Sequence, residues 1–219
     1  PAPSAKAALL RSSMPLFWFS LLNALMGTLD VLLLGALGTA ADVGVYGIAV
    51  RLAMLTSFIL LAVNSYVGPQ FAAFNERKDT DGLVRLAIAS TRLTMAAAAP
   101  LLLMFVLAPK WLLGLFGQEF AGSGIVLTVL ALGQFVNVAT GSVGQILIMS
   151  GHERDMRNAS FASAAVTLAL HVVLIPRFGA AGAAVATAAG VMTLNLIASA
   201  MVRRRVGVFV HFFASRKRL

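Results

Sequence analysis

The chain of 219 residues contains no cysteine. It therefore has no disulfide bond, no thiolate metal ligand and no cysteine nucleophile. Charged residues are also scarce, at 11% of the sequence, whereas 59% of the residues are hydrophobic. A water-soluble domain needs more polar surface than this composition supplies. The sequence therefore predicts a protein that uses lipid as its solvent.

Enzyme motifs are missing as well. The chain has no GxSxG, HExxH or Walker sequence and no pair of carboxylates at helical spacing. The expected loops are too short to build a catalytic site, so we expect no enzyme, no cofactor and no metal. The net charge of +9 comes mainly from cations at helix ends and near the C-terminus, where anionic lipid headgroups are the ordinary partner. Nucleic acid is not an expected partner.

Six long apolar stretches fill most of the chain. About 20 apolar residues cross a bilayer as a helix, so the sequence predicts an all-α, polytopic membrane protein with six transmembrane helices. The first stretch is too long for a signal peptide and leads directly into another, which favours a retained helix. Gly68-Pro69 is expected to break or kink the second helix. The predicted parts are a cytoplasmic segment 1–13, helices at 14–38, 43–67, 83–108, 122–149, 158–175 and 179–202, and a basic cytoplasmic tail 203–219.

Lysine and arginine residues are divided unequally among the gaps. Fourteen of the 17 lie near the N-terminus, around the second and fourth gaps between stretches, or near the C-terminus. Only Lys110 and Arg177 lie in other gaps, and Arg51 lies inside a stretch. Because positively charged loops stay on the cytoplasmic side, this pattern predicts that both termini are cytoplasmic.

Two ionisable side chains, Asp30 and Arg51, lie well inside the predicted helices. A charge facing lipid costs about 2.5 to 3.5 kcal/mol or more, so both should face protein. Each lies roughly 12 Å from the outward end of its helix at about 1.5 Å per residue, which predicts that they face each other. Two roles stay open: an ion pair that locks the helical hairpin, or a site for an anionic substrate or for protons.

Amide side chains form a second candidate site. Gln134, Asn137 and Gln145 lie on one side of the fourth predicted helix, with Asn137 and Gln145 each within roughly 60° of Gln134 on a helical wheel. Asn23 continues the polar pattern on the first helix. Such a stripe suits a hydrated cavity that binds sugar hydroxyls, or hydrogen bonds between helices.

The fifth predicted helix repeats this polar face more weakly. Ser160, Ser163, Thr167 and His171 lie along one side of it. His171 lies near the outward end, where a lone histidine suits a helix-end or packing residue, with proton transfer as the alternative.

The last predicted helix carries small residues and one amide. Gly182, Ala186 and Gly190 follow one another at four-residue spacing, which predicts close approach of another backbone. Asn195 is an isolated amide that could simply bond to neighbouring backbone.

Several short phrases carry a resemblance to a known family, from the first predicted helix to Val208. Each phrase is weak alone, whereas their order and spacing together make the match fairly specific. They are GTLD at 27–30, DVGVYG at 42–47 followed by Arg51, LFGQEF at 115–120, GHE at 151–153, IPRFGAAGAA at 175–184, Asn195, and the arginines before Gly207.

On these residues the chain resembles the polysaccharide exporters of the O-antigen and teichoic-acid type. These are lipid-linked oligosaccharide flippases related to multidrug and toxic compound extrusion transporters. The resemblance implies two six-helix halves around a central cavity, with this chain as the C-terminal half-bundle. The chain is then either a fragment or a half-transporter that pairs with a second copy or a partner.

The resemblance also implies a function in the bacterial inner membrane. A polyprenyl-diphosphate-linked oligosaccharide would move from the inner to the outer leaflet by alternating access, for export of surface polysaccharide such as lipopolysaccharide O-antigen. Expected partners are this substrate, membrane lipids, and the missing N-terminal half or a second copy. The alternatives are a cation-coupled multidrug antiporter and a non-transporting membrane subunit. The candidate cavity residues are Arg51, Asp30, Asn23, Gln134, Asn137, Gln145 and His171.

Overall fold

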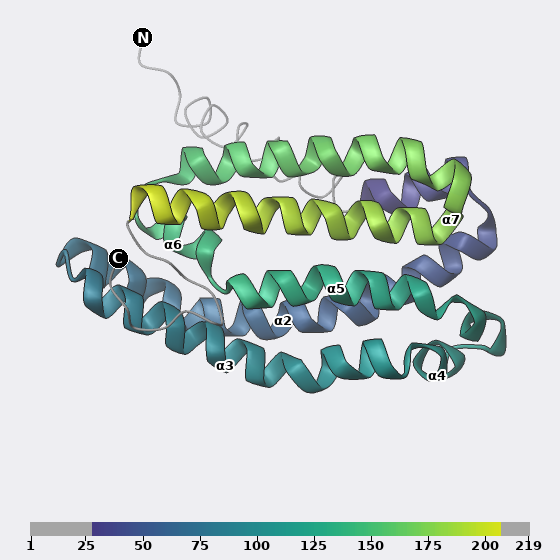
Figure 1. The fold of residues 1–219 in the computed structure, drawn as a ribbon, viewed down its shortest axis with the longest axis horizontal. Helices are drawn as coiled ribbons and strands as arrows, with labels where there is room; N and C mark the ends of the chain where they lie inside the picture. The colour runs from purple at the N-terminus through teal and green to yellow at the C-terminus, as the bar shows by residue number, and fades with distance from the viewer. Residues whose placement is uncertain (1–27, 207–219) are drawn as a thin grey trace, which may run out of the picture.

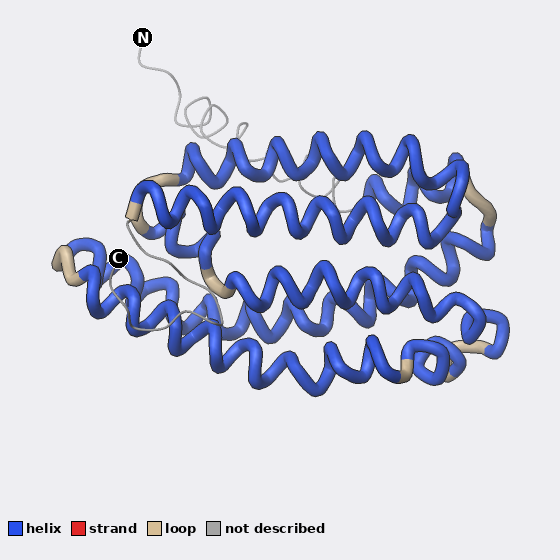
Figure 2. Tube along the Cα trace, viewed as in Figure 1, coloured by secondary structure: helices blue, strands red, loops and turns tan. Residues whose placement is uncertain are grey.

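The computed structural model describes residues 28–206, and every regular element in this range is a helix (Figure 2). Four of the described helices are long and apolar enough to cross a bilayer, so the all-α membrane class is confirmed. The six-helix count and the two-lobed arrangement stay predictions. The segment 1–13, most of the first predicted helix and the tail from 207 onward lie outside the described residues.

Short connections join the helices. Thr39 and Asp79 accept hydrogen bonds from the first turns of the two helices that they precede. Pro109 begins a short helix, at a position where its missing N–H leaves no bond unmade. The helices are Thr28–Leu37, α2 (Ala40–Glu76), α3 (Thr80–Leu107), α4 (Pro109–Gly114), the 3₁₀ helix η1 (Gln118–Ser123), α5 (Gly124–Thr140), α6 (Val143–Met149) and α7 (Glu153–Arg205).

α7 is a helical hairpin (Figure 1). Gly179 has non-helical φ 52° and ψ −131°, and the chain folds back there into two adjacent arms, 153–178 and 180–205. The Ser163 hydroxyl of the first arm donates to the Gly190 carbonyl of the second at 2.8 Å. A Cβ atom on Gly182 would collide with the Leu174 carbonyl, and one on Gly190 with the Thr167 hydroxyl. The predicted close approach at these small residues is therefore confirmed, with the first arm as the neighbour.

The sequence predicts a break or a kink at Gly68-Pro69, and the structure has no break there, because α2 continues through both residues to Glu76. Pro69 is exposed, and its ring occupies the outside of the helix. Gly68 and Phe71 are buried on the opposite side of the helix. A proline costs one backbone hydrogen bond, whereas the burial of Gly68 and Phe71 favours a continuous helix.

The predicted helix 122–149 is interrupted, which corrects the expectation of one continuous span. α5 ends at Thr140, Gly141 adopts φ 68° and ψ −144°, and α6 begins at Val143. Gly141 is buried against α3, where an added Cβ atom would collide with the Thr91 hydroxyl. Glycine is needed here both for its positive φ and for this close approach.

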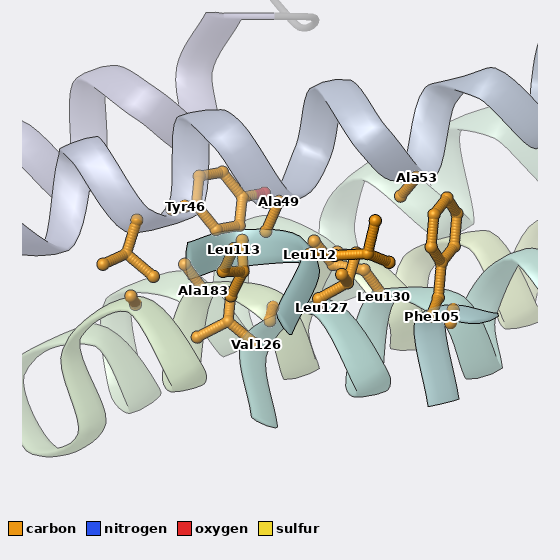
Figure 3. Close-up of a cluster of buried hydrophobic side chains, with 14 of the residues drawn as sticks. Tyr46, Ala49, Ala53, Phe105, Leu112, Leu113, Val126, Leu127, Leu130 and Ala183 are labelled. Atoms are coloured by element: carbon orange, nitrogen blue, oxygen red, sulfur yellow. The ribbon is translucent and has the colours of Figure 1, made fainter. Parts of the chain in front are cut away.

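Two apolar clusters fill the bundle at different depths. The α4-end cluster joins α2, α3, α4, α5 and α7, and Figure 3 shows part of it around Tyr46, Phe105 and Leu113. The α6-end cluster joins α2, α3, α6 and α7 around Phe71 and Ile146. Since lipid is as apolar as these side chains, close packing and hydrogen bonds stabilise the bundle more than transfer from water does.

A polar layer separates the two clusters. On α2, α3 and the second arm of α7, buried polar residues occur in sequence between members of the two clusters. The three α3 hydroxyls donate to carbonyls three or four residues earlier in their own helix, so their burial leaves no unsatisfied donor. The buried members of the polar layer are Thr56, Ser90, Thr91, Thr94, Thr140, Ser142 and Asn195.

The turns gather at two opposite ends of the bundle (Figure 1). One end holds the start of α2, α4, η1 and the α7 turn, with Lys110 and Arg177. The other end holds the α2–α3 turn, α6 and both termini of α7. Arg77, Lys78, Arg154, Arg157 and Arg203 to Arg205 lie at this second end. The predicted division of basic residues between alternate gaps thus becomes a division between the two ends of the bundle.

Candidate functional site

Asp30 is bound by a buried tyrosine of α2. The Tyr46 hydroxyl donates to Asp30 Oδ2 at 2.7 Å, and the backbone N–H of Val31 donates to Asp30 Oδ1 at 2.9 Å. Tyr46 is 0% exposed. A carboxylate with two donors is therefore held at a depth where an unpaired charge would be costly.

The hydrogen-bonded row continues from Tyr46 into both arms of α7. The Tyr46 hydroxyl lies 2.7 Å from Thr187 Oγ1, and Thr187 Oγ1 lies 3.4 Å from His171 Nε2. His171 is only 2% exposed. We call Asp30, Tyr46, Thr187 and His171 the polar row. Two predicted site residues, Asp30 and His171, are thus brought into one cluster.

The expected ion pair between Asp30 and Arg51 is not formed. Asp30 bonds to Tyr46, and Arg51 follows Tyr46 by five residues, which places it about 140° further around α2. Arg51 is exposed and makes no salt bridge within residues 28–206. Equal depth in the bundle does not make Asp30 and Arg51 an ion pair, because the angular position of Arg51 on α2 directs its side chain away from Asp30.

Gln134 and Asn137 join α5 to its neighbours. Gln134 Oε1 accepts hydrogen bonds from Asn137 Nδ2 at 3.1 Å and from Ser57 Oγ at 3.0 Å. Asn195 Nδ2, on the second arm of α7, donates to Asn137 Oδ1 at 3.2 Å. Thr140 Oγ1 in turn donates to Asn195 Oδ1 at 3.0 Å. These amides join helices, and Gln134 and Asn137 also stay partly exposed.

Gln145 is separated from the other two amides. The interruption at Gly141 places Gln145 on α6, where it lies against Gly68 of α2. A Cβ atom on Gly68 would come within 2.7 Å of the Gln145 nitrogen. The predicted amide stripe is therefore divided between α5 and α6. Asn23 lies outside the described residues.

The hydroxyls predicted along the fifth helix bond to backbone carbonyls. Ser160 Oγ donates to the Met156 carbonyl at 3.0 Å, and Thr167 Oγ1 donates to the Ser163 carbonyl at 2.8 Å. Of the four side chains predicted on this face, only His171 reaches another polar side chain.

Asp42 was missed from the sequence as a candidate residue. Its Oδ2 accepts from the Thr39 N–H at 3.0 Å and from the Thr39 hydroxyl at 2.7 Å, which forms a capping box. Its Oδ1 accepts from the backbone N–H of Ala180 at 3.0 Å. The spacing of a threonine three residues before an aspartate is the signal that could have revealed the cap. No local signal predicts the contact with Ala180.

Comparison with known proteins gives a consistent set of relatives. A family model described as "Polysaccharide biosynthesis protein" matches residues 4–125, which is more than half of the chain. A probable low-salt glycan biosynthesis flippase of Haloferax volcanii is 30% identical over 161 residues, covering 73% of this chain and 34% of the relative. A probable flippase of the same archaeon is 29% identical over 177 residues, covering 77% of this chain and 36% of the relative. The chain thus spans about a third of the length of these relatives. No solved structure gives a significant match.

Proposed function

Because the chain belongs to the polysaccharide biosynthesis protein family, we propose that it is part of a transporter that flips a lipid-linked oligosaccharide across the membrane. Both relatives from Haloferax volcanii are named as probable flippases, and one name specifies glycan biosynthesis. The proposed substrate is a polyprenyl-diphosphate-linked oligosaccharide that moves from the inner to the outer leaflet of the cell membrane, for export of surface polysaccharide.

The position of Arg51 is the observation that carries this proposal. It lies about 16 Å from the start of α2, at a depth within the hydrocarbon core of a bilayer. It is exposed and has no carboxylate partner within the described residues. Met54, Leu55 and Phe58 follow it on the same exposed side of α2. A permanent cation at this depth needs a hydrated cavity or an anionic ligand.

A diphosphate is the ligand class that suits this arginine. The guanidinium group presents paired N–H donors that match phosphate oxygens, and it stays charged at every physiological pH. In our proposal the lipid tail remains in the bilayer while the diphosphate and glycan pass Arg51. Gln134, Asn137 and Gln145 would meet sugar hydroxyls where their amides are not used between helices, and Asn23 would do the same on the first helix.

The proposed cavity needs a second wall. The face of α2 that bears Arg51 is uncovered in the described part of the chain. We propose that another six-helix half, either elsewhere in the same protein or in a second copy, covers this face and that the two halves open alternately to each side. The basic end of the bundle would lie in the cytoplasm together with both termini of this chain.

The test uses the intact gene product in cells that lack their own copy, with export of surface glycan as the readout. Arg51→Ala should lower export about tenfold or more, because a charge-assisted bond to the diphosphate is lost. Arg51→Lys should retain part of the activity, since the charge remains without the paired donors. Arg157→Ala is a matched control at an exposed position of α7. Undiminished export by Arg51→Ala, at a normal amount of inserted protein, rules out this role.

A further inference from the structure

The polar row joins separate helical segments through side chains alone. Asp30 comes from the segment Thr28–Leu37, Tyr46 from α2, and His171 and Thr187 from the two arms of α7. The consecutive distances are 2.7, 2.7 and 3.4 Å. Packing between these helices requires no titratable groups. We infer that the polar row is a proton-binding and proton-transfer site, with Asp30 and His171 as its two ends.

The donors of the row point in one direction. Tyr46 gives its single hydroxyl proton to Asp30, so its oxygen accepts from Thr187. The Thr187 oxygen is then free to accept a proton from Nε2 of His171. When Nε2 of His171 carries a proton, as it does in the doubly protonated ring, every O–H or N–H bond along the row is directed toward Asp30.

This direction permits the transfer of one proton. When His171 is doubly protonated, its Nε2–H bond breaks as the proton passes to the Thr187 oxygen. Thr187 passes its own proton to Tyr46, and Tyr46 passes its own to Asp30, where a new O–H bond forms. An imidazolium and a carboxylate become an imidazole and a carboxylic acid. The hydroxyl groups are unchanged, and no oxidant or further reactant is needed.

The surroundings of Tyr46, in the middle of the row, are apolar. The α4-end cluster contributes Leu113 and Val126 near Tyr46 (Figure 3). The side-chain partners described along the row are a carboxylate, two hydroxyls and an imidazole, with no lysine or arginine among them. Because separated charges are costly at this depth, the transfer that turns a charged pair into a neutral one is favoured there.

Other charged groups near the row are already engaged or directed elsewhere. On α2, Asp42 lies one turn from Tyr46 and accepts from Thr39 and Ala180. Arg51 of the same helix lies on a different side. Lys110 of α4 and Arg177 of α7 are both exposed. The titratable groups of the row are Asp30, Tyr46 and His171. Their side-chain partners are therefore the other members of the row.

Proton binding would alter contacts between helices. A hydrogen bond to a carboxylate is roughly twice as strong as one between neutral groups. Protonation of Asp30 therefore weakens its bond to Tyr46 and loosens the segment Thr28–Leu37 from α2 and α7. The proton site stands on this geometry alone, whereas its coupling to transport rests on the proposed function.

Two measurements on the intact protein separate these claims. Infrared difference spectra between acid and neutral pH, in detergent, report carboxyl protonation without transport. The carboxyl groups outside the row also contribute bands, so the signal is the component of the wild-type carboxylic-acid band that is lost in Asp30→Asn and shifted in Tyr46→Phe. Tyr66→Phe is the matched control, because Tyr66 lies on the same helix and is 74% exposed. It should leave the band unchanged.

The second measurement uses sodium-free vesicles and a fluorescently labelled polyprenyl-diphosphate disaccharide. A pH gradient should accelerate flipping by wild type and by Tyr66→Phe. Asp30→Asn and His171→Gln should lose this dependence on the gradient, since neither replacement titrates. His171→Gln should keep the contact between the two arms of α7, because a glutamine amide N–H can still donate to Thr187.

The outcomes distinguish the two proposals. A carboxylic-acid band that is identical in wild type and Asp30→Asn overturns the proton site. If Asp30→Asn still responds to the pH gradient, or if wild type responds to added sodium in place of the pH gradient, the coupling of the proton site to transport is overturned. If wild type does not flip the probe, the proposed function fails, and the infrared result alone upholds or overturns the proton site.

Discussion

Asp42 accepts a hydrogen bond at 3.0 Å from the backbone N–H of Ala180, which lies 138 residues further along the chain. The same carboxylate closes the capping box with Thr39 at the start of α2. One side chain thus serves the N-termini of two helices, α2 and the second arm of α7. Negative charge at a helix N-terminus is also favourable to the helix dipole.

Asp42→Ala should therefore destabilise the bundle by about 1 to 2 kcal/mol, since it removes bonds at both helix starts. Asp42→Asn should cost less, because its amide oxygen can still accept one of these bonds. The free energy of unfolding in mixed micelles measures the effect. Glu76→Ala, at an exposed position near the end of α2, is the control. Equal stability of Asp42→Ala and Glu76→Ala would contradict the linking role.

Gly179→Ala should be more damaging than an ordinary glycine replacement. The residue has φ 52°, where a Cβ atom costs about 1 to 2 kcal/mol. The added methyl would also collide with the Asp42 carboxylate. Gly151→Ala has the positive φ without a nearby atom, and Gly122→Ala has neither constraint. Thermal unfolding in detergent should rank Gly179→Ala below Gly151→Ala, and Gly151→Ala below Gly122→Ala. A different order would contradict the contact with Asp42.

Asn195→Leu tests the polar layer as a connection between helices. The substitution removes the bonds to Asn137 and Thr140, and buried bonds of this kind in membrane proteins contribute about 0.6 to 2 kcal/mol. We expect a loss of that size in the free energy of unfolding. Asn158→Leu is the control, because Asn158 is exposed on the same helix. Stability equal to that of the control would mean that packing alone joins α5 to α7.

The absence of cysteine makes cross-linking a clean test of the fold. A Cβ atom on Gly133 of α5 would lie 3.0 Å from that of Ala188 on α7. Disulfides join Cβ atoms about 3.8 Å apart, so a small separation of the helices admits the bond. The double variant Gly133→Cys with Ala188→Cys should cross-link under mild oxidation. After the chain is cleaved between the two helices, the disulfide keeps the fragments together, which is detected as a mobility shift on a denaturing gel. Cross-linking at the rate of the pair Gly122→Cys with Ala188→Cys would contradict the α5–α7 contact.

Much of this fold follows from the sequence, because apolar length determines the spanning helices and short polar gaps determine their order. The division of α7 at Gly179 falls where the gap at 176–178 predicts it. The same reasoning failed at Pro69 and Gly141, for opposite reasons. Local propensity favoured a break at Pro69, where the burial of Gly68 and Phe71 keeps the helix continuous. It favoured continuity at Gly141, where close contact with Thr91 accompanies the interruption of the helix.

The candidate site was less predictable than the fold. Helical rise placed Asp30 and Arg51 at one depth, but the partner of a buried charge also depends on rotation about the helix axis. That rotation is determined by tertiary packing, so Tyr46 replaced Arg51 as the partner. Likewise, His171 and Asn195 appeared isolated because their partners lie on the other arm of α7 and on α5, respectively.

The interruption between α5 and α6 has a consequence for hydration. The first N–H groups of a helix have no acceptor within that helix, and α6 begins inside the bundle. At this depth lipid supplies no hydrogen bond, so protein groups or water must satisfy these N–H groups. The buried Ser142 hydroxyl, which has no partner within the described residues, lies at the same place. Only the two turns of α6 separate this point from the basic end, which is a much shorter path than the length of a membrane-spanning helix.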